Sequence, residues 1–238
     1  MKGSCIIVTG CSSGIGKSVS ELLLKKGVTV IGLSRTQRNF LPKSDRYRWY
    51  NCDISDLKKL PELFTQIFAD HGGIDAFVSC AGFGNFKGFE SFSASQIISY
   101  LNANLLSHMI MTRLLLPKMK KRKTGNIIFI GSEAALRGSR QGSLYNTAKF
   151  GLRGFSQAIR EECSKSNIHV SIINPGMVRT EFFKKLSFKP GENKNNAIEP
   201  GDVAKVVLSI LEMRDGTVID EINLSPLNKV IRFNKDLM

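Results

Sequence analysis

A glycine-rich turn near the start of the chain constrains the fold more than any other feature. Cys5 to Thr9 has the length and apolarity of a buried strand, and Gly14 to Lys26 has the pattern of a helix that ends at Gly27. The turn between them reads Thr-Gly-Cys-Ser-Ser-Gly-Ile-Gly over Thr9 to Gly16. Such a turn brings backbone N–H groups and the positive end of a helix dipole to one point, which suits a pyrophosphate. Glycine-rich turns also occur for packing alone, but the N-terminal strand–helix–strand context favours a nucleotide site.

Strand-like and helix-like segments alternate along the whole chain. The predicted strands are Cys5–Thr9, Val28–Leu33, Tyr47–Cys52, Ile74–Ser79, Asn126–Gly131, Ile168–Asn174 and Val218–Leu224. The predicted helices are Gly14–Lys26, Asp56–Asp70, Ser143–Ser164 and Val203–Met213, with two further long helices separated near Asn102–Asn104. Short apolar strands that alternate with helices form parallel sheets covered on both faces. The sequence therefore predicts an α/β protein with a doubly wound, Rossmann-type parallel sheet of about seven strands.

The length of the chain and its one long irregular segment predict the domain organisation. A chain of 238 residues without repeats or linkers suits one α/β domain over residues 1–238. Residues 180–200 are rich in Lys, Asn, Gly and Pro, yet they include Phe182, Phe183 and Phe188. Long ordered loops in compact domains are usually functional, so we expect residues 180–200 to form a substrate lid. The alternative is a flexible surface loop.

Cysteine, histidine and apolar patterns exclude several classes of protein. The five cysteines show no C-x-x-C spacing and the three histidines are scattered, so we expect reduced thiols and no metal site. No apolar run approaches the ~18 residues of a membrane span. The apolar stretch after Ser4 is too short for a signal peptide. We therefore expect a soluble protein of the cytoplasm.

The net charge of +14 would suit nucleic acid, an anionic membrane or an acidic protein partner. The densest basic cluster, Lys118 to Lys123, follows a helical pattern and precedes Gly125, where cations complement a helix C-terminus. No aromatic residues interleave with this cluster, as a stacking surface for bases would need. Nucleic-acid binding is therefore not favoured, whereas steering of an acidic substrate or an acyl carrier protein remains open.

The end of the second predicted strand bears on the choice of nucleotide. An acidic residue at this point would hold a ribose 2′-hydroxyl, but the chain has Ser34-Arg35-Thr36. Arg35, with Arg38 nearby, would pair with a 2′-phosphate, which a carboxylate would repel. We therefore predict NADP(H) as the cofactor. Asp53, after the third predicted strand, would accept from the adenine amino group or would cap the following helix.

A Tyr-x-x-x-Lys sequence gives the clearest indication of chemistry. On a helix, Tyr145 and Lys149 share a face, so the phenol and the ammonium group point into one site. A fixed cation favours phenolate and lowers the pKa of a tyrosine from its usual value near ~10. Ser132 precedes Tyr145 by thirteen residues. The alternative is that Tyr145 packs in the core and Lys149 is solvated.

These features together resemble the short-chain dehydrogenase/reductase family, over essentially the whole chain. The turn from Thr9 to Gly16 resembles the family's Thr-Gly-x-x-x-Gly-x-Gly, and Asn174 to Thr180 resembles its segment that passes the nicotinamide. The resemblance implies the catalytic set Asn104, Ser132, Tyr145 and Lys149. The implied cofactor contacts are Gly10, Ser12, Ser13, Gly14, Ile15, Gly16, Ser34, Arg35, Asp53, Ala81, Gly82, Tyr145, Lys149, Pro175, Gly176, Val178 and Thr180.

The sequence departs from the family pattern after the fourth predicted strand and at the C-terminus. Ser79-Cys80-Ala81-Gly82 stands where the family has Asn-Asn-Ala-Gly. The ending from Ile219 to Pro226 lacks the Gly-Gly that is usual in carrier-protein ketoacyl reductases of the family. It is more similar to the branch that reduces small hydroxy acids and carbonyl compounds.

The resemblance also implies a mechanism, a substrate class and an assembly. Tyr145 would donate a proton to a carbonyl oxygen as hydride arrives from the nicotinamide, Ser132 would stabilise the alkoxide, and Asn104 would hold a water that passes protons toward Lys149. The expected substrate is a small keto compound or hydroxy acid; the alternatives are a 3-oxoacyl-carrier-protein substrate, or a noncatalytic role in sensing NADP(H) or binding nucleic acid. A homodimer or homotetramer would form through the segments 101–119 and 143–164.

Three loops are expected to decide which carbonyl compound is accepted. They are residues 83–92, 134–142 and 180–198, because each follows or precedes a predicted catalytic or cofactor-binding segment. Arg137 and Arg140 lie between Ser132 and Tyr145, so we expect them at the substrate entrance, where they would favour anionic groups.

Overall fold

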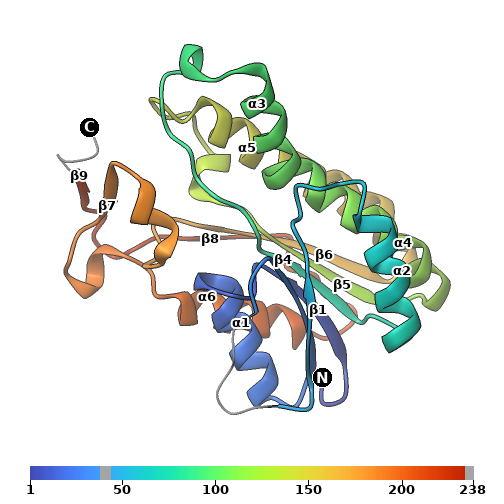
Figure 1. The fold of residues 1–238 in the computed structure, drawn as a ribbon. Coiled ribbons are helices and arrows are strands. Elements are labelled where there is room, and N and C mark those ends of the chain that lie inside the picture. Colours follow the sequence, from blue (N-terminus) through green and yellow to red (C-terminus); the bar gives the residue numbers. More distant parts are fainter. Residues whose placement is uncertain (38–43, 234–238) are drawn as a thin grey trace.

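A seven-stranded parallel sheet forms the centre of the molecule (Figure 1), in a computed structural model that describes residues 1–37 and 44–233. The strand order is β3-β2-β1-β4-β5-β6-β8, and all neighbouring pairs are parallel. The strands are β1 (Cys5–Thr9), β2 (Thr29–Ser34), β3 (Tyr47–Asn51), β4 (Ala76–Ser79), β5 (Gly125–Ile130), β6 (Ile168–Pro175) and β8 (Glu221–Leu224). The order reverses between β1 and β4, and ligands bind such sheets in the crevice at that reversal. The predicted doubly wound fold is confirmed.

Six α-helices in the described residues cover both faces of the sheet. They are α1 (Gly14–Lys25), α2 (Leu60–His71), α3 (Ala94–Leu101), α4 (Ser107–Arg122), α5 (Ser143–Cys163) and α6 (Pro200–Leu211). In Figure 1, α2, α4 and α5 lie on one face, and α1 and α6 on the other. None of the helices in the described part of the chain is long and apolar enough to cross a membrane.

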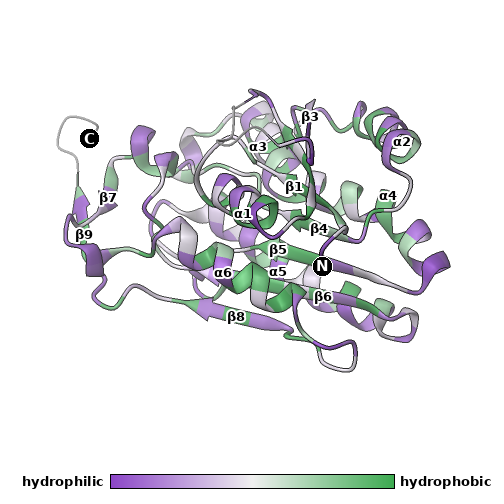
Figure 2. Ribbon diagram, turned by 90° about the horizontal axis from the view of Figure 1, so that it is seen from below, coloured by the Kyte–Doolittle hydropathy of each residue, from purple (hydrophilic) through white to green (hydrophobic). Residues whose placement is uncertain are grey.

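Alternation along the strands divides the core between the two faces. Ile7 and Phe77 belong to the cluster under α2, α4 and α5, whereas their neighbours Ile6 and Val78 belong to the cluster under α1 and α6. Figure 2 shows the central strands as predominantly hydrophobic, and β8 at the sheet edge as hydrophilic. Strands buried on both faces carry nearly continuous apolar runs, which explains why they were predicted correctly.

A small antiparallel ribbon lies beyond one end of the sheet, close to the C-terminus (Figure 1). It pairs β7 (Phe188–Pro190) with β9 (Ile231–Phe233). The prediction that residues 180–200 are irregular was therefore wrong in part, since they contain β7 and two 3₁₀ turns, Glu181–Lys185 and Lys194–Asn196. β9 was not predicted at all. Three-residue strands are too short to show a period, and their pairing partner is distant in sequence.

Element boundaries differ from prediction mainly at helix starts. The helix expected from Asp56 begins at Leu60, with Pro61 in its first turn, and the helix expected from Val203 begins at Pro200. Proline is well suited to the first helical turn because it has no N–H to leave unpaired. The predicted separation near Asn102–Asn104 is found as the π-helical turn Asn102–Leu106, which joins α3 to α4. The first of the two predicted long helices is short, since α3 has eight residues.

Candidate active site

The three glycines of the β1–α1 turn are each required by backbone geometry. Gly10 and Gly14 have φ values of 69° and 53°, in the left-handed region that glycine adopts most easily. Gly16 has no room for a side chain, because an added Cβ would lie 2.4 Å from the carbonyl oxygen of Gly10. The turn therefore folds back on itself through backbone contacts.

The start of α1 is free to receive an anion. Ser13 occupies the N-cap of this fully described helix, yet its side chain makes no capping hydrogen bond and the first turn holds no acidic residue. The first N–H groups of a helix have no partner within the helix, and its dipole favours negative charge there. Ser12, Ser13 and Ile15 thus stand where the sequence predicts a pyrophosphate, and that role stays a prediction.

The segment after β4 packs directly against the glycine turn. The hydroxyl oxygen of Thr9 accepts hydrogen bonds from the backbone N–H groups of Cys80 and Ala81, both at 2.9 Å. A Cβ on Gly10 would lie 3.0 Å from Cα of Ala81. Thr9 thus joins the ends of β1 and β4, at the point where strand order reverses.

Ser79, which replaces the first asparagine of the family pattern, has a partner of its own. Its hydroxyl lies 2.6 Å from Nδ1 of His108 on α4, and both side chains are fully buried. Burial and then the charge of Lys149 lower the pKa of His108 to about 3, so this imidazole is neutral. A neutral Ser79–His108 pair therefore ties the end of β4 to α4.

The end of β2 is organised by Ser34. Its hydroxyl donates to the carbonyl oxygen of Thr36 at 2.8 Å and accepts from Nε1 of Trp49 at 3.0 Å. These bonds fix the turn that carries Arg35, whose side chain is exposed. Arg38, the expected helper, lies outside the described residues. Contact of Ser34 and Arg35 with a cofactor stays a prediction.

Asp53 does not cap a helix. Its Oδ1 accepts from the N–H and hydroxyl of Ser55, at 2.9 and 2.7 Å, and α2 begins only at Leu60. The two hydrogen bonds from Ser55, with a smaller contribution from the Arg35 charge, lower the pKa of Asp53. The capping alternative was wrong, because Asp53 closes a local turn instead. Its role toward adenine stays a prediction.

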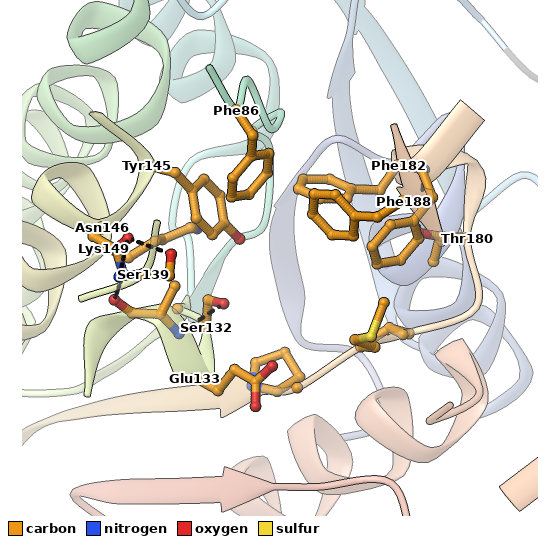
Figure 3. Close-up of a pocket in the computed structure, with 18 of the residues that line it drawn as sticks. Phe86, Ser132, Glu133, Ser139, Tyr145, Asn146, Lys149, Thr180, Phe182 and Phe188 are labelled. Atoms are coloured by element: carbon orange, nitrogen blue, oxygen red, sulfur yellow. Dashed lines mark hydrogen bonds between the residues drawn. The ribbon is translucent and has the colours of Figure 1, made fainter. Parts of the chain in front are cut away.

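One cavity of about 410 Å³ is lined by nine of the predicted site residues (Figure 3). The predicted residues that line it are Ile15, Gly82, Ser132, Tyr145, Lys149, Pro175, Gly176, Val178 and Thr180. The other predicted cofactor contacts, on the glycine turn and at the ends of β2, β3 and β4, lie outside its lining. The cavity has the size of a small-molecule site.

Tyr145 and Lys149 are buried in the first two turns of α5, contrary to the alternative of a solvated lysine. Lys149 Nζ donates to the carbonyl oxygen of Ile130 at 3.0 Å and lies 5.9 Å from the ring centre of Tyr145. Burial lowers the pKa of Lys149 to about 8. Burial raises the pKa of Tyr145 to about 12, opposed by a hydrogen bond from Ser132. The predicted net lowering of this pKa was wrong for the protein alone, because desolvation of the phenolate outweighs the hydrogen bond from Ser132.

Asn104 lies next to the cavity without lining it. Its Oδ1 accepts from the N–H of Phe83 at 2.9 Å, and its Nδ2 donates to the carbonyl oxygen of Tyr100 at 3.1 Å. A Cβ on Gly82 would lie 2.8 Å from the same Oδ1. The buried amide therefore positions the segment after β4, and its predicted role with a water stays a prediction.

The segment after β6 returns to the glycine turn, as its sequence predicted. Pro175, Gly176 and Val178 line the cavity, and Thr180 closes the approach to α1. A Cβ on Gly14 would lie 3.2 Å from Cγ2 of Thr180. The start of α1 and the ends of β4, β5 and β6 thus surround one space.

Tyr145 and four phenylalanines form a closed chain of ring contacts, of which Figure 3 shows Tyr145, Phe86, Phe182 and Phe188. Ring centres are separated by 5.1 Å for Tyr145–Phe86, 5.0 Å for Phe86–Phe188, 5.9 Å for Phe188–Phe183, 5.2 Å for Phe183–Phe182 and 6.0 Å for Phe182–Tyr145. Gly84 permits this contact, since a Cβ there would lie 2.5 Å from Phe182. The predicted lid phenylalanines do reach the site, and so does Phe86, from the predicted loop 83–92, although this residue was not itself singled out.

Asn146 is a site residue that sequence reasoning missed. Its Oδ1 accepts from the hydroxyl and N–H of Ser139, at 2.8 and 3.2 Å. Its Nδ2 donates to the carbonyl oxygens of Ala134 and Arg137, both at 2.8 Å. Figure 3 shows Asn146 turned toward Ser139 and away from the phenylalanines that pack near Tyr145. Its position beside Tyr145 was the available signal, but the residue type alone does not predict a loop anchor.

The C-terminal segment also reaches the cavity, which the sequence did not predict. Lys229 forms an ion pair with Glu133 at 2.5 Å, and Lys229, Ile231 and Phe233 line the cavity wall. Asn196 Nδ2 donates to the carbonyl oxygen of Asn228 at 2.8 Å and fastens this segment to residues 180–200. A contact between residues 96 positions apart has no local sequence pattern.

Comparison with known proteins agrees with this architecture. The family model described as short chain dehydrogenase matches residues 4–190. Dehydrogenase/reductase SDR family member 11 of Mus musculus is 30% identical, with 94% of each chain covered. The NADP-dependent 3-hydroxy acid dehydrogenase of Schizosaccharomyces pombe is 28% identical and covers 95% of this chain and 93% of its own. The crystal structure of a metagenomic short-chain oxidoreductase in complex with NADP is 27% identical, with a TM-score of 0.82 over 96% of this chain and 99% of that one.

Proposed function

The chain belongs to the short-chain dehydrogenase family, and from that premise we propose that it is an NADP(H)-dependent oxidoreductase that interconverts a carbonyl compound and an alcohol. One observation carries the proposal. Ser132 after β5 and the pair Tyr145 and Lys149 on α5 line the same cavity as Gly176 after β6. A proton donor, a hydrogen-bond donor and a buried amine thus converge where a carbonyl group would lie.

The phenol of Tyr145 is the proposed general acid. Burial keeps its pKa near 12, so the group is protonated at neutral pH and has a proton to donate to a carbonyl oxygen. Ser132 Oγ accepts from the N–H of Ala134 at 3.1 Å, and its hydroxyl proton, which faces the Tyr145 phenol in the protein alone, would turn to the carbonyl oxygen when the substrate binds. The nicotinamide supplies or accepts the hydride. Lys149, anchored on Ile130, places a positive charge beside the phenol and favours its ionised form after proton transfer.

NADP(H) is the cofactor that the residues fit. The uncapped start of α1 and the close-packed glycine turn suit a pyrophosphate, and the exposed Arg35 after β2 suits a 2′-phosphate. The name of the yeast relative and the complex of the metagenomic oxidoreductase support the same assignment. We expect Arg35→Ala to raise the KM for NADPH by about tenfold or more and to leave the KM for NADH unchanged. Equal use of the two cofactors by the wild type would contradict the assignment.

Replacement of Tyr145 tests the proposed reaction. Tyr145→Phe should fold and bind NADPH but lose turnover by about a hundredfold or more, because no other group supplies the proton. Tyr50→Phe is the matched control, since this phenol contacts Asp70 and His71 far from the cavity. The assay follows NADPH absorbance with ketones, hydroxy acids, acyl thioesters and pterins, and circular dichroism checks folding. Near wild-type turnover by Tyr145→Phe would rule out its role as the acid.

A homodimer or homotetramer is the proposed assembly. Leu106 before α4 and Phe150 on α5 are large apolar side chains with 38% and 43% of their surface exposed. An interface through these two segments would cover them. Light scattering should give a multiple of the chain mass, and Phe150→Ser should lower it. A monomeric wild type at micromolar concentration would contradict the proposal.

A further inference from the structure

We infer that the substrate is a bulky apolar ketone that carries a carboxylate. The phenylalanine side chains next to Tyr145 would contact its apolar part, and Arg137 and Arg140 would bind its carboxylate. The inference rests on the proposed function and names the substrate class of the same site. It differs from the sequence-based expectation of a small hydroxy acid. Three features of the cavity carry it: its apolar wall, its uncompensated charge, and the anchor of the arginine loop.

The apolar wall is too extensive for a small polar substrate. Six phenylalanines line the cavity: Phe83, Phe86, Phe182, Phe183, Phe188 and Phe233. Three of them come from residues 180–190 and one from β9, so separate segments converge to build this surface. Burying apolar ligand surface against such side chains stabilises a complex by roughly 25 cal/mol per Å². A substrate with only a few carbon atoms would leave most of this wall in contact with water.

The charge of the cavity lining is positive and incompletely paired. Among the described residues, Glu133 is the only carboxylate in the lining, and it pairs with Lys229. Lys149 donates to Ile130 deep in the site. The exposed guanidinium groups of Arg137 and Arg140 make no ion pair and no side-chain hydrogen bond within the described residues. A guanidinium binds a carboxylate in a bidentate way, which fixes orientation as well as charge.

Asn146 fixes the arginine loop relative to the phenol. It immediately follows Tyr145 on α5, and its amide donates to the carbonyl oxygen of Arg137 at 2.8 Å. The same side chain accepts two hydrogen bonds from Ser139, between the two arginines. An arginine on an untethered loop would pay for its ordering when a ligand binds, whereas this loop is ordered beforehand. Asn146 is therefore a positioning residue that sets the separation between ketone and carboxylate.

Three ketones separate the two parts of the inference. The probe 5-oxo-5-phenylpentanoate has a phenyl ketone and a distal carboxylate. Its methyl ester removes the charge and keeps the shape, and 5-oxohexanoate keeps the charge and replaces the phenyl group by methyl. We expect kcat/KM for the phenyl keto acid to exceed that of each comparator by about tenfold or more, chiefly through KM.

The arginines are tested by the ratio of kcat/KM for the acid to that for the ester. The double variant Arg137→Gln, Arg140→Gln should bring this ratio to about one, through loss of the charge-assisted bonds. Arg113→Gln is the matched control, because Arg113 is an exposed arginine of α4 outside the cavity lining, and it should leave the ratio unchanged. A wild-type ratio near one, or an unchanged ratio in the double variant, would overturn the inference.

Binding distinguishes failure of this inference from failure of the proposed function. Calorimetric titration of the acid and the ester into the NADPH-loaded Tyr145→Phe variant reports recognition without turnover. Tighter binding of the acid than of the ester, abolished by the two arginine substitutions, supports the inference about the substrate. If the wild type binds the acid in this way but reduces neither ketone, the result counts against the proposed reaction alone. Equal binding of acid and ester overturns the inference whatever the activity.

Discussion

The cofactor side and the substrate side of the cavity are built from different materials. The β1–α1 turn closes on itself at Gly16 and meets the end of β4 at Gly10, both through backbone contacts, and it meets the side chain of Thr180 after β6 at Gly14. The substrate side is made of side chains instead. Its phenylalanines, arginines and Lys229 come from loops, 3₁₀ turns and the β7–β9 ribbon, between residues 83 and 233.

This difference determines how each side tolerates change. A close contact between backbone segments leaves no room for an added methyl group, because protein interiors are close-packed and the main chain itself would have to move. An aromatic wall loses contact area when a side chain is shortened, but the loops that carry it keep their course. A single substitution on the cofactor side should therefore lower both stability and NADPH affinity strongly. A substitution on the substrate side should change the KM for the ketone by a smaller amount.

Gly16→Ala should give the largest effect on stability and NADPH affinity. A small effect would contradict the distinction between the cofactor side and the substrate side. The new Cβ would lie 2.4 Å from the carbonyl oxygen of Gly10, so the turn must open. We expect a loss of about 3 kcal/mol in the free energy of unfolding and at least a tenfold weaker affinity for NADPH. Urea denaturation and fluorescence titration measure the two quantities.

Gly201→Ala is the control for this substitution. Gly201 lies in the first turn of α6 and has nothing within 4 Å of an added Cβ, so stability should be unchanged or slightly higher. If Gly16→Ala were as stable as the wild type and bound NADPH equally well, the glycine turn could relax at no cost in free energy. That result would contradict a site that depends on close backbone contacts.

The cofactor side was predictable from sequence because its determinants are local. Gly10, Gly14 and Gly16 lie in one eight-residue motif, and the spacing of Tyr145 and Lys149 places them on one helix face. The strands were predicted for a similar reason, since each carries its own apolar run.

The substrate side was predictable only in part, because its contacts are distant in sequence. Asn146, Phe86 and Lys229 acquire their roles from partners that no local pattern indicates. β9 is three residues long and pairs with β7 across more than forty positions. The direction of the Tyr145 pKa was also missed, because burial depends on how the lid and α5 close over the phenol.

Lys149→Met should give the next largest effect. It measures how much the buried charge of Lys149, which lies where the two sides meet, lowers the free energy of unfolding. Burial lowers the pKa of Lys149 to about 8 from 10.5, so between these values the unfolded chain binds more protons than the folded one. Wild-type stability should therefore rise with pH across this window, by roughly 3 kcal/mol in total at about 1.4 kcal/mol per pH unit. At pH 7 the inactive variant should be more stable than the wild type, by about 2 kcal/mol after loss of the bond to Ile130.

Urea denaturation of both proteins at pH 7 and pH 10 checks this expectation. The advantage of Lys149→Met should shrink as the pH rises, because the folded wild-type lysine is neutral at pH 10 and the unfolded lysine begins to lose its proton there. A variant that is less stable at pH 7, or an advantage that does not change with pH, would mean that the lysine is not buried at a cost.

Phe188→Ala should give the smallest effect and sharpens the comparison on the substrate side. Phe188 contacts Phe86 and Phe183 in the chain of ring contacts, so its loss removes part of the wall without moving the glycine turn. We expect the KM for an apolar ketone such as 5-oxo-5-phenylpentanoate to rise by about tenfold, which corresponds to about 1.4 kcal/mol, with the Kd for NADPH unchanged. Phe89→Ala is the control, since that ring is exposed and contacts only Phe92 among the aromatic side chains of the described residues. Equal losses of NADPH and ketone affinity in Phe188→Ala would mean that the two sides are one cooperative structure, and that the lid holds the cofactor as well as the substrate.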